Sequence, residues 1–321
     1  MIKIENFDNA LLSGITYGGH SGSKRGIVFN NEKWFLKYPK STSNMNVSGL
    51  SYTTFPISEY LGSHIYCVLE IDTHETILRY ANNKIVVACK DFLGDSEVIL
   101  DYNSIKNDYN EVVEKELEKL SSSKSNHGTD LEELLIVMEN NHYFQEVPEL
   151  KKRFWQMFII DALISNNDRN AGNWGLIFNK DKINYLVTPV FDNGASFYSK
   201  SSDEKMKGIL EDFSKRKQVF YDSSICSFNE NGKIINPLKY IESMKNVDCN
   251  NALIELFPKI DMDKIKKIFD DIPKEYNGLV VLSDSQKEFY YQSLLYKYEN
   301  VLKVIYKKLI DKNTWFLKEL C

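Results

Sequence analysis

The stretch Asp168-Arg169-Asn170-Ala171-Gly172-Asn173, followed later by Asp192-Asn193-Gly194, decides the fold of this chain. It sets an acid, an amide and a second acid in an order that phosphoryl transfer uses. The first aspartate can orient a hydroxyl group and accept its proton. The asparagine that closes the first motif and the aspartate that opens the second can bind the metal that bridges nucleotide phosphates. We therefore interpret Asp168 as a base, and Asn173 and Asp192 as metal ligands.

Each part of this pattern is common by itself, and an Asp-Asn-Gly tripeptide is often only a turn. The interpretation rests on the order of the parts and on their predicted structural context. Two short apolar runs, Trp174 to Phe178 and Tyr185 to Val190, separate the two motifs and flank a polar stretch. They predict a β-hairpin, which would bring both ends of the pattern to one rim.

A glycine-rich turn lies far upstream of these motifs. Glycines let backbone N–H groups approach a phosphate closely. The turn departs from the Walker A pattern and leads into a strand instead of a helix, and the tip of a hairpin is the alternative interpretation. The candidate nucleotide-binding residues in it are Gly18, Gly19, Ser21, Gly22, Ser23 and Lys24.

Lys37 ends an apolar run that starts at Trp34, and a lysine there is costly unless its ammonium group meets an anion. Phosphate oxygens and an acidic side chain would both serve. Glu59 is the candidate acid, in a short predicted helix with Pro56 in its first turn. The alternatives are a lysine that reaches solvent from an edge strand and an exposed glutamate that the helix dipole favours.

These residues resemble those of the HipA-like serine/threonine kinases, and most closely the compact branch that includes the cell-translocating kinase A (CtkA) family. The resemblance covers most of the chain and is most specific from Asp161 to Gly194. It implies a bilobal, protein-kinase-like α+β fold. The strand-rich N-lobe would take residues 1–94 and the helical C-lobe residues 95–321, with the nucleotide between them.

The same resemblance implies the cofactors and the site residues. Lys37 would hold the phosphates of ATP, Asp168 would be the catalytic base, and Asn173 and Asp192 would bind Mg²⁺. The hinge that receives adenine would be Lys90, Asp91 and Phe92.

The resemblance further implies a serine or threonine acceptor in a protein substrate. It also implies autophosphorylation near the glycine-rich turn, where Ser21 and Ser23 carry the hydroxyl groups. HipA toxins carry an N-terminal subdomain before this turn, which here would be absent or supplied by another chain. An antitoxin or accessory chain is therefore an expected partner of a toxin or effector kinase of this type.

Two other functions remain open at this stage. Lipid kinases use a similar acid–amide–acid order, so a phosphoinositide or another small molecule could be the acceptor. A nucleotide-binding interaction module without activity is the third reading, although the joint presence of Lys37, Asp168, Asn173 and Asp192 disfavours it.

Composition excludes several classes of protein. The net charge of −5 over 321 residues argues against a broad nucleic-acid or membrane surface. No stretch approaches the roughly 18 apolar residues of a membrane span, and the first residues lack the apolar core of a signal peptide. The five cysteines are scattered, which is typical of reduced thiols and favours a cytoplasmic location.

The rest of the chain predicts local structure. A hairpin is expected over residues 76–89, and a long buried helix from Pro148 to Ser165, in which Asp161 would bind loop amides or Arg169. Ser199 to Gln218 is interpreted as a loop, either an activation or substrate loop or a plain solvated one. A further helix starts at Ser283, which forms a capping box with Gln286 and extends to about residue 312.

Overall fold

The computed structural model describes residues 1–18, 24–120 and 129–319, and for residues 312–319 it describes the backbone alone. The chain forms two compact units, each made of three chain segments. The first segment of the first unit ends at Phe92, close to residue 94, where the N-lobe is predicted to end. The division into these two lobes remains a prediction. The first unit comprises Met1–Phe92, Phe191–Asp222 and Lys259–Lys297, and the second comprises Leu93–Val190, Ser223–Pro258 and Tyr298–Cys321.

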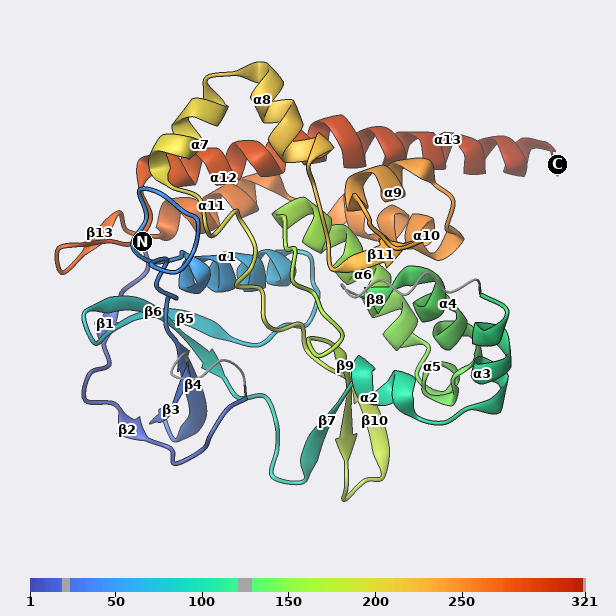
Figure 1. Ribbon diagram of the computed structural model, residues 1–321, viewed down its shortest axis with the longest axis horizontal. Coiled ribbons are helices and arrows are strands. Elements are labelled where there is room, and N and C mark those ends of the chain that lie inside the picture. The colour runs from blue at the N-terminus through green and yellow to red at the C-terminus, as the bar shows by residue number, and fades with distance from the viewer. Residues whose placement is uncertain (19–23, 121–128, 320–321) are drawn as a thin grey trace. The chain divides into compact units, whose positions relative to one another are not determined.

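The first unit contains a six-stranded sheet (Figure 1), with strand order β1-β5-β6-β4-β3-β2. Neighbouring strands are antiparallel except for the parallel pair β1 and β5. The strands are β1 (Glu5–Asn6), β2 (Leu11–Leu12), β3 (Lys24–Phe29), β4 (Glu32–Lys37), β5 (Thr76–Ala81) and β6 (Lys84–Lys90).

Two asparagine turns set the register of this sheet. Asn30 and Asn31 join β3 to β4, and Asn82 and Asn83 join β5 to β6. All four have φ between 50° and 61°, in the left-handed region that two-residue hairpin turns require and asparagine tolerates. The predicted hairpin over residues 76–89 is thereby confirmed.

The alternation of side chains along β4 places Lys37 on the opposite sheet face from the core. Trp34 and Leu36 are buried in that core, so Phe35 and Lys37 project from the other face. Helix α1 (Phe55–Val68) packs against β5 and β6. Within the described part of residues 1–94 it is the single helix, as predicted.

The interpretation of Ser199 to Gln218 as a plain solvated loop is wrong. The segment contains helix α7 (Asp203–Leu210) and helix α8 (Phe213–Lys217). Ser202 caps α7 by accepting a hydrogen bond from a backbone amide in its first turn, and Met206 is buried beneath it. The charged surface of these helices hid the few apolar positions that anchor them.

The remainder of the first unit is mostly helical. The predicted capping box at the start of α12 is confirmed, because Gln286 N donates to Ser283 Oγ and Ser283 N donates to Gln286 Oε1. The elements are the π-helix η1 (Gln218–Asp222), helices α11 (Met262–Asp271) and α12 (Asp284–Lys297), and the hairpin β13 (Glu275–Tyr276) with β14 (Leu279–Val280).

Helix α6 (Glu149–Ile164) is the most deeply buried helix of the second unit, as its apolar density predicts. Pro148 occupies its N-cap position, and Ser165 ends it in the left-handed conformation. The predicted hairpin between the two motifs is present as β9 (Gly175–Asn179) and β10 (Asn184–Val187). β9 also pairs with β7 (Glu97–Asp101).

The other elements of the second unit surround α6. The helix expected from Ser283 to about residue 312 is longer than predicted and is interrupted by a π-helix, η3 (Tyr298–Leu302). The elements are α2 (Tyr102–Asn107), α3 (Glu111–Glu118), α4 (Leu131–Asn140), α5 (His142–Glu146), α9 (Pro237–Ser243), α10 (Val247–Leu256), α13 (Lys303–Glu319) and the sheet of β8 (Thr129–Asp130), β11 (Phe228–Glu230) and β12 (Lys233–Ile234).

Candidate active site

Lys37 is the centre of a charged network in the first unit. Its Nζ donates to Glu59 Oε2 and to Asp192 Oδ1, each at 2.8 Å. The predicted pairing with Glu59 is present, and Asp192 is a second partner that the sequence did not reveal. The Glu59 side chain is 1% exposed, whereas that of Asp192 is 42% exposed. One side of the network therefore stays open to a ligand.

The three groups of this network keep one another ionised. Burial by itself lowers the pKa of Lys37, but the carboxylates of Asp192 and Glu59 outweigh burial and raise it. Burial likewise raises the pKa of Glu59, and the charge of Lys37 together with the contact from the His74 ring reverses that shift. Lys37 also lowers the pKa of Asp192. At neutral pH the network holds one ammonium and two carboxylates.

Two buried hydrogen bonds tie the Asp-Asn-Gly segment to helix α1. Asn193 Nδ2 donates to Ser63 Oγ at 3.0 Å, and Ser58 Oγ donates to the backbone carbonyl of Ser196 at 2.9 Å. Both serines belong to α1, the helix that carries Glu59. The segment that supplies Asp192 is thus held by the same helix that supplies the other carboxylate.

The backbone of this segment explains two residue types in the motif. A Cβ atom at Gly194 would lie 3.2 Å from Glu59 Oε2 and 3.4 Å from the carbonyl oxygen of Phe55, so glycine lets the segment pass close to α1. Asp192 has φ of 61°, in the left-handed region that few side chains adopt and aspartate tolerates. Such backbone strain clusters at functional sites.

The structure describes only part of the glycine-rich turn. Gly18 is exposed, and Gly19, Ser21, Gly22 and Ser23 lie outside the described residues. Lys24 pairs in register with Lys37 across β3 and β4, and its Nζ lies 5.5 Å from the centre of the Phe35 ring. Burial and then repulsion from Lys37 lower the pKa of Lys24. Two cations therefore share this face of the sheet.

The predicted hinge residues have different surroundings. The Lys90 side chain pairs with Glu32 Oε1 at 2.7 Å. Asp91 Oδ2 accepts a hydrogen bond of 2.8 Å from Tyr17 Oη, and the Phe92 ring lies 5.6 Å from that of Phe191. These side chains thus make structural contacts, and the backbone N–H groups of Lys90 and Asp91 donate to the carbonyl oxygens of Glu75 and Lys33.

Asp168 and Asn173 lie together in the second unit. Asp168 is exposed, and its backbone carbonyl accepts a hydrogen bond of 3.0 Å from Asn173 Nδ2. This bond uses the nitrogen of the Asn173 amide and leaves its oxygen for another ligand. The first motif therefore folds back on itself and brings the acid close to the amide.

A buried ion pair supports this loop from behind, as predicted for Asp161. Arg169 Nε donates to Asp161 Oδ2 at 2.8 Å, and Arg169 Nη2 donates to Oδ1 at 3.1 Å. Asn166 Nδ2 also donates to Asp161 Oδ1 at 3.0 Å. Trp174 is core, as predicted, stacked on the buried Tyr102 ring.

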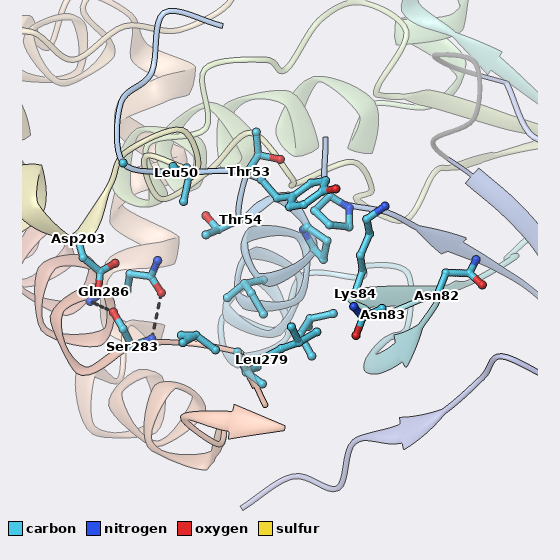
Figure 2. A pocket seen from close by; sticks show the side chains of 18 of the residues that line it. Leu50, Thr53, Thr54, Asn82, Asn83, Lys84, Asp203, Leu279, Ser283 and Gln286 are labelled. Atoms are coloured by element: carbon cyan, nitrogen blue, oxygen red, sulfur yellow. Dashed lines mark hydrogen bonds between the residues drawn. The ribbon is translucent and has the colours of Figure 1, made fainter. Parts of the chain in front are cut away.

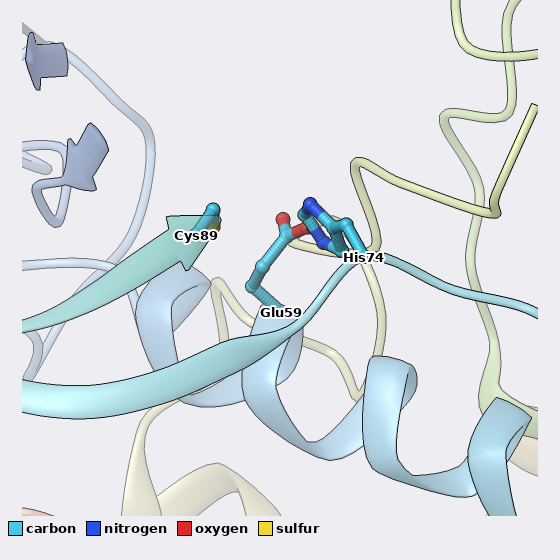
Figure 3. A group of neighbouring side chains, drawn as sticks. All are labelled: Glu59, His74 and Cys89. Carbon is cyan, nitrogen blue, oxygen red and sulfur yellow. The ribbon is translucent and has the colours of Figure 1, made fainter. Parts of the chain in front are cut away.

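The first unit also contains a cluster of three buried polar side chains that the sequence does not indicate. Glu59, His74 and Cys89 place one ligand atom each within 4.8 Å of one another, and all three are buried (Figure 3). Lys37 donates to one oxygen of the Glu59 carboxylate, Oε2, and His74 lies against the other, Oε1. No spacing in the sequence points to His74, because its contact joins a helix to a separate loop.

The first unit also contains an open pocket of about 700 Å³ (Figure 2). Thr53 and Thr54 line it beside the start of α1, with Lys84 on one side and Asp203 on another. None of the predicted site residues is among those that line this pocket.

The fold and the order of these residues are those of a protein-kinase-like phosphotransferase. The chain is 32% identical over 297 residues to the serine/threonine-protein kinase CtkA of Helicobacter pylori, a match that covers 92% of this chain and 85% of that protein. The crystal structure of the H. pylori proinflammatory kinase CtkA matches with a TM-score of 0.84 and 31% identity, over 97% of this chain and 98% of that one.

The chain therefore belongs to the CtkA family of serine/threonine-protein kinases, and the predicted fold and enzyme class are confirmed. Membership implies the use of a nucleotide and a metal in general terms. No protein-family model matches the chain.

A HipA–HipB–operator complex of Shewanella oneidensis matches with a TM-score of 0.47 and 11% identity, too weak to support a conclusion. Within the described residues, no helix has both the length and the apolar character needed to cross a bilayer.

Proposed function

We propose that this chain transfers the γ-phosphoryl group of ATP to a serine or threonine hydroxyl group of a protein substrate. The observation that carries the proposal is the Lys37 ammonium held between Glu59 and Asp192. In kinases a strand lysine paired with a helix glutamate binds nucleotide phosphates, and a nearby aspartate binds their metal. Membership in the CtkA family supports the same reaction.

Each residue has a distinct task in this proposal. Lys37 binds phosphate oxygens and offsets the charge that develops as the γ-phosphoryl group leaves. Glu59 holds that ammonium in place from the buried side. Asp168, which is exposed, orients the acceptor hydroxyl and accepts its proton. The Asp161–Arg169 pair keeps the loop that carries Asp168 in one conformation.

The residues present fit magnesium. Mg²⁺ prefers hard oxygen ligands, and Asp192 offers a partly exposed carboxylate while Asn173 offers the oxygen of its amide. When bound, the ion neutralises charge on the nucleotide phosphates. We assign Asp192 and Asn173 as the chain's ligands to it.

Three substitutions test the proposal. Asp168→Asn should leave ATP affinity near that of the parent protein and reduce phosphoryl transfer by about 10²–10⁴-fold. Asp192→Ala should abolish Mg²⁺-dependent ATP binding, and Lys37→Ala should weaken binding and turnover together. Calorimetry and transfer assays with protein, lipid and small-molecule acceptors give the readouts.

Asp181→Asn is the matched control for Asp168→Asn, because Asp181 is also an exposed aspartate of the second unit. It should behave like the parent. Parent-like turnover in Asp168→Asn would contradict the assignment of the base. Transfer to lipid acceptors alone would leave the kinase chemistry in place and overturn the protein acceptor.

Autophosphorylation at Ser21 or Ser23 belongs to the same proposal. A phosphate there adds roughly two negative charges beside the cations Lys24 and Lys37, where it competes with the triphosphate. The alternative acceptors are Ser199, Ser201 and Ser202; Ser199 and Ser202 are buried, which makes them poorer acceptors, and Ser201 is half-buried. Mass spectrometry after incubation with Mg²⁺ and ATP should find the mark on residues 17–24 in the parent protein and not in Asp168→Asn.

A further inference from the structure

His74 is a buried imidazole that none of the roles above uses. It lies in the segment between α1 and β5, and it is 3% exposed. Its Nε2 atom lies 2.9 Å from Glu59 Oε1, while the other carboxylate oxygen of Glu59 accepts from Lys37. Figure 3 shows the ring directed at the Glu59 carboxylate. Glu59 Oε2 thus accepts a hydrogen bond from Lys37, and Glu59 Oε1 has the His74 ring as its close polar neighbour.

We propose that His74 is a positioning residue for phosphoryl transfer, which acts on Lys37 through Glu59. The terminal torsion of a glutamate is soft, so one hydrogen bond does not fix the orientation of its carboxylate. Bulk solvent does not reach this carboxylate, because Glu59 has 0% exposure. His74 supplies the second contact, and it keeps Oε2 turned toward the ammonium. This inference rests on the proposed function of Lys37.

The surroundings leave Glu59 little other support. The sulfur of Cys89 lies within 4.8 Å of the contact atoms, and burial raises the pKa of that thiol, so it stays neutral. Gly194 packs against Oε2 without a polar side chain of its own. Without His74, Glu59 would keep Lys37 as its firm partner and could rotate about that single bond.

Two substitutions at His74 separate positioning from simple packing. His74→Gln keeps an N–H donor that can reach Glu59 Oε1, whereas His74→Leu fills similar space without a donor. We expect His74→Leu to lower kcat by about 10–100-fold, the usual scale for losing a residue that orients a functional ligand. The KM for ATP should change less than kcat, and His74→Gln should stay within about 3-fold of the parent.

His64 gives a matched control in the same unit. It lies on α1, its Nε2 is 3.3 Å from the carbonyl oxygen of Thr76, and its ring lies 4.0 Å from the Tyr60 ring. His64→Leu should leave kcat near that of the parent. An equal loss of kcat in both leucine variants would show a general packing effect and overturn the proposal.

A double-mutant cycle with Glu59→Gln tests whether His74 acts through the carboxylate. In the Glu59→Gln background, His74→Leu should lower kcat by less than about 2-fold further. An undiminished loss in that background would overturn the proposal, as would a His74→Gln variant no better than His74→Leu. If His74→Leu fails to fold, His74→Asn replaces it, because its shorter amide does not reach Glu59.

Two measurements keep this inference apart from its alternatives. If Lys37→Ala retains parent-like turnover, the proposed function fails; if Lys37→Ala is inactive and His74→Leu is parent-like, only the inference fails. Metal analysis of the purified protein addresses the cluster of Glu59, His74 and Cys89. Stoichiometric zinc that is lost in His74→Gln would make the cluster a metal site and overturn the positioning role.

Discussion

The charged residues of the first unit and those of the second unit are organised in opposite ways. In the first, Lys37 is shared between Glu59 and Asp192, and the functional groups neutralise one another directly. In the second, the buried pair of Asp161 and Arg169 lies behind the loop, and Asp168, the proposed base, is exposed.

The difference fits the tasks that we propose for the two groups of residues. Groups that receive a highly charged triphosphate and its metal exchange one ionic partner for another when the substrate binds, so they are best held charged in advance. A base that accepts a proton from a neutral hydroxyl must reach its substrate freely, and its precision comes from the rigidity of the loop behind it. The predictions below test this contrast, from the largest expected effect to the smallest.

Asp161→Ala should have the largest effect on stability. It removes the carboxylate that accepts two hydrogen bonds from the buried Arg169 guanidinium, and breaking a buried pair in this way costs about 3–5 kcal/mol. Urea unfolding measures the loss. Asp181→Ala, an exposed control in the same unit, should change stability by less than about 0.5 kcal/mol. Similar stability for the two variants would remove the supporting role of the pair.

Gly194→Ala addresses the first unit. The added Cβ would lie 3.2 Å from Glu59 Oε2, so the segment or the carboxylate must shift, at about 1–3 kcal/mol. Stability and turnover should both fall. Gly208→Ala in α7 is the opposite case, because nothing lies within 4 Å of its Cβ position and alanine favours a helix by about 1 kcal/mol. If Gly194→Ala has the stability and turnover of the parent protein, the close approach of residue 194 to Glu59 is not needed for either.

Acid should weaken the first network selectively. The folded-state pKa values of Glu59 and Asp192 are lowered, so their stabilisation is present above the unfolded pKa of about 4 and is lost as pH falls below it. The pKa of Lys37 is raised, so the contribution of its ammonium group to the stability of the folded state is lost only in strong alkali. The difference in melting temperature between the parent and Lys37→Met should therefore shrink from pH 7 to pH 3. A constant difference would contradict the ion pairing.

Ser283→Ala should have the smallest effect, and it lies outside both charged regions. It removes half of the capping box at the start of α12, which is worth about 1 kcal/mol. Thermal unfolding measures the change, and turnover should stay at the parent level. A loss of activity from this variant would mean that the first unit transmits any destabilisation to its site.

Much of the site was predictable where a physical rule ties residue type to environment. Lys37 needed an anion because it ends an apolar strand, and Asp161 needed donors because it sits in a buried helix. His74 escaped prediction because no local pattern marks a contact between a helix and a distant loop. The helices α7 and α8 escaped because charged residues cover the few apolar positions that anchor them.

The separation of the Lys37 partners along the chain bears on how the protein is made. Asp192 follows Lys37 by 155 residues, whereas Glu59 follows it by only 22. At about 5–20 residues per second, the ribosome delivers Asp192 roughly 8–30 s after the lysine. During that interval Glu59 is the counter-ion at hand, so the nascent sheet can bury its lysine before the second carboxylate has been synthesised.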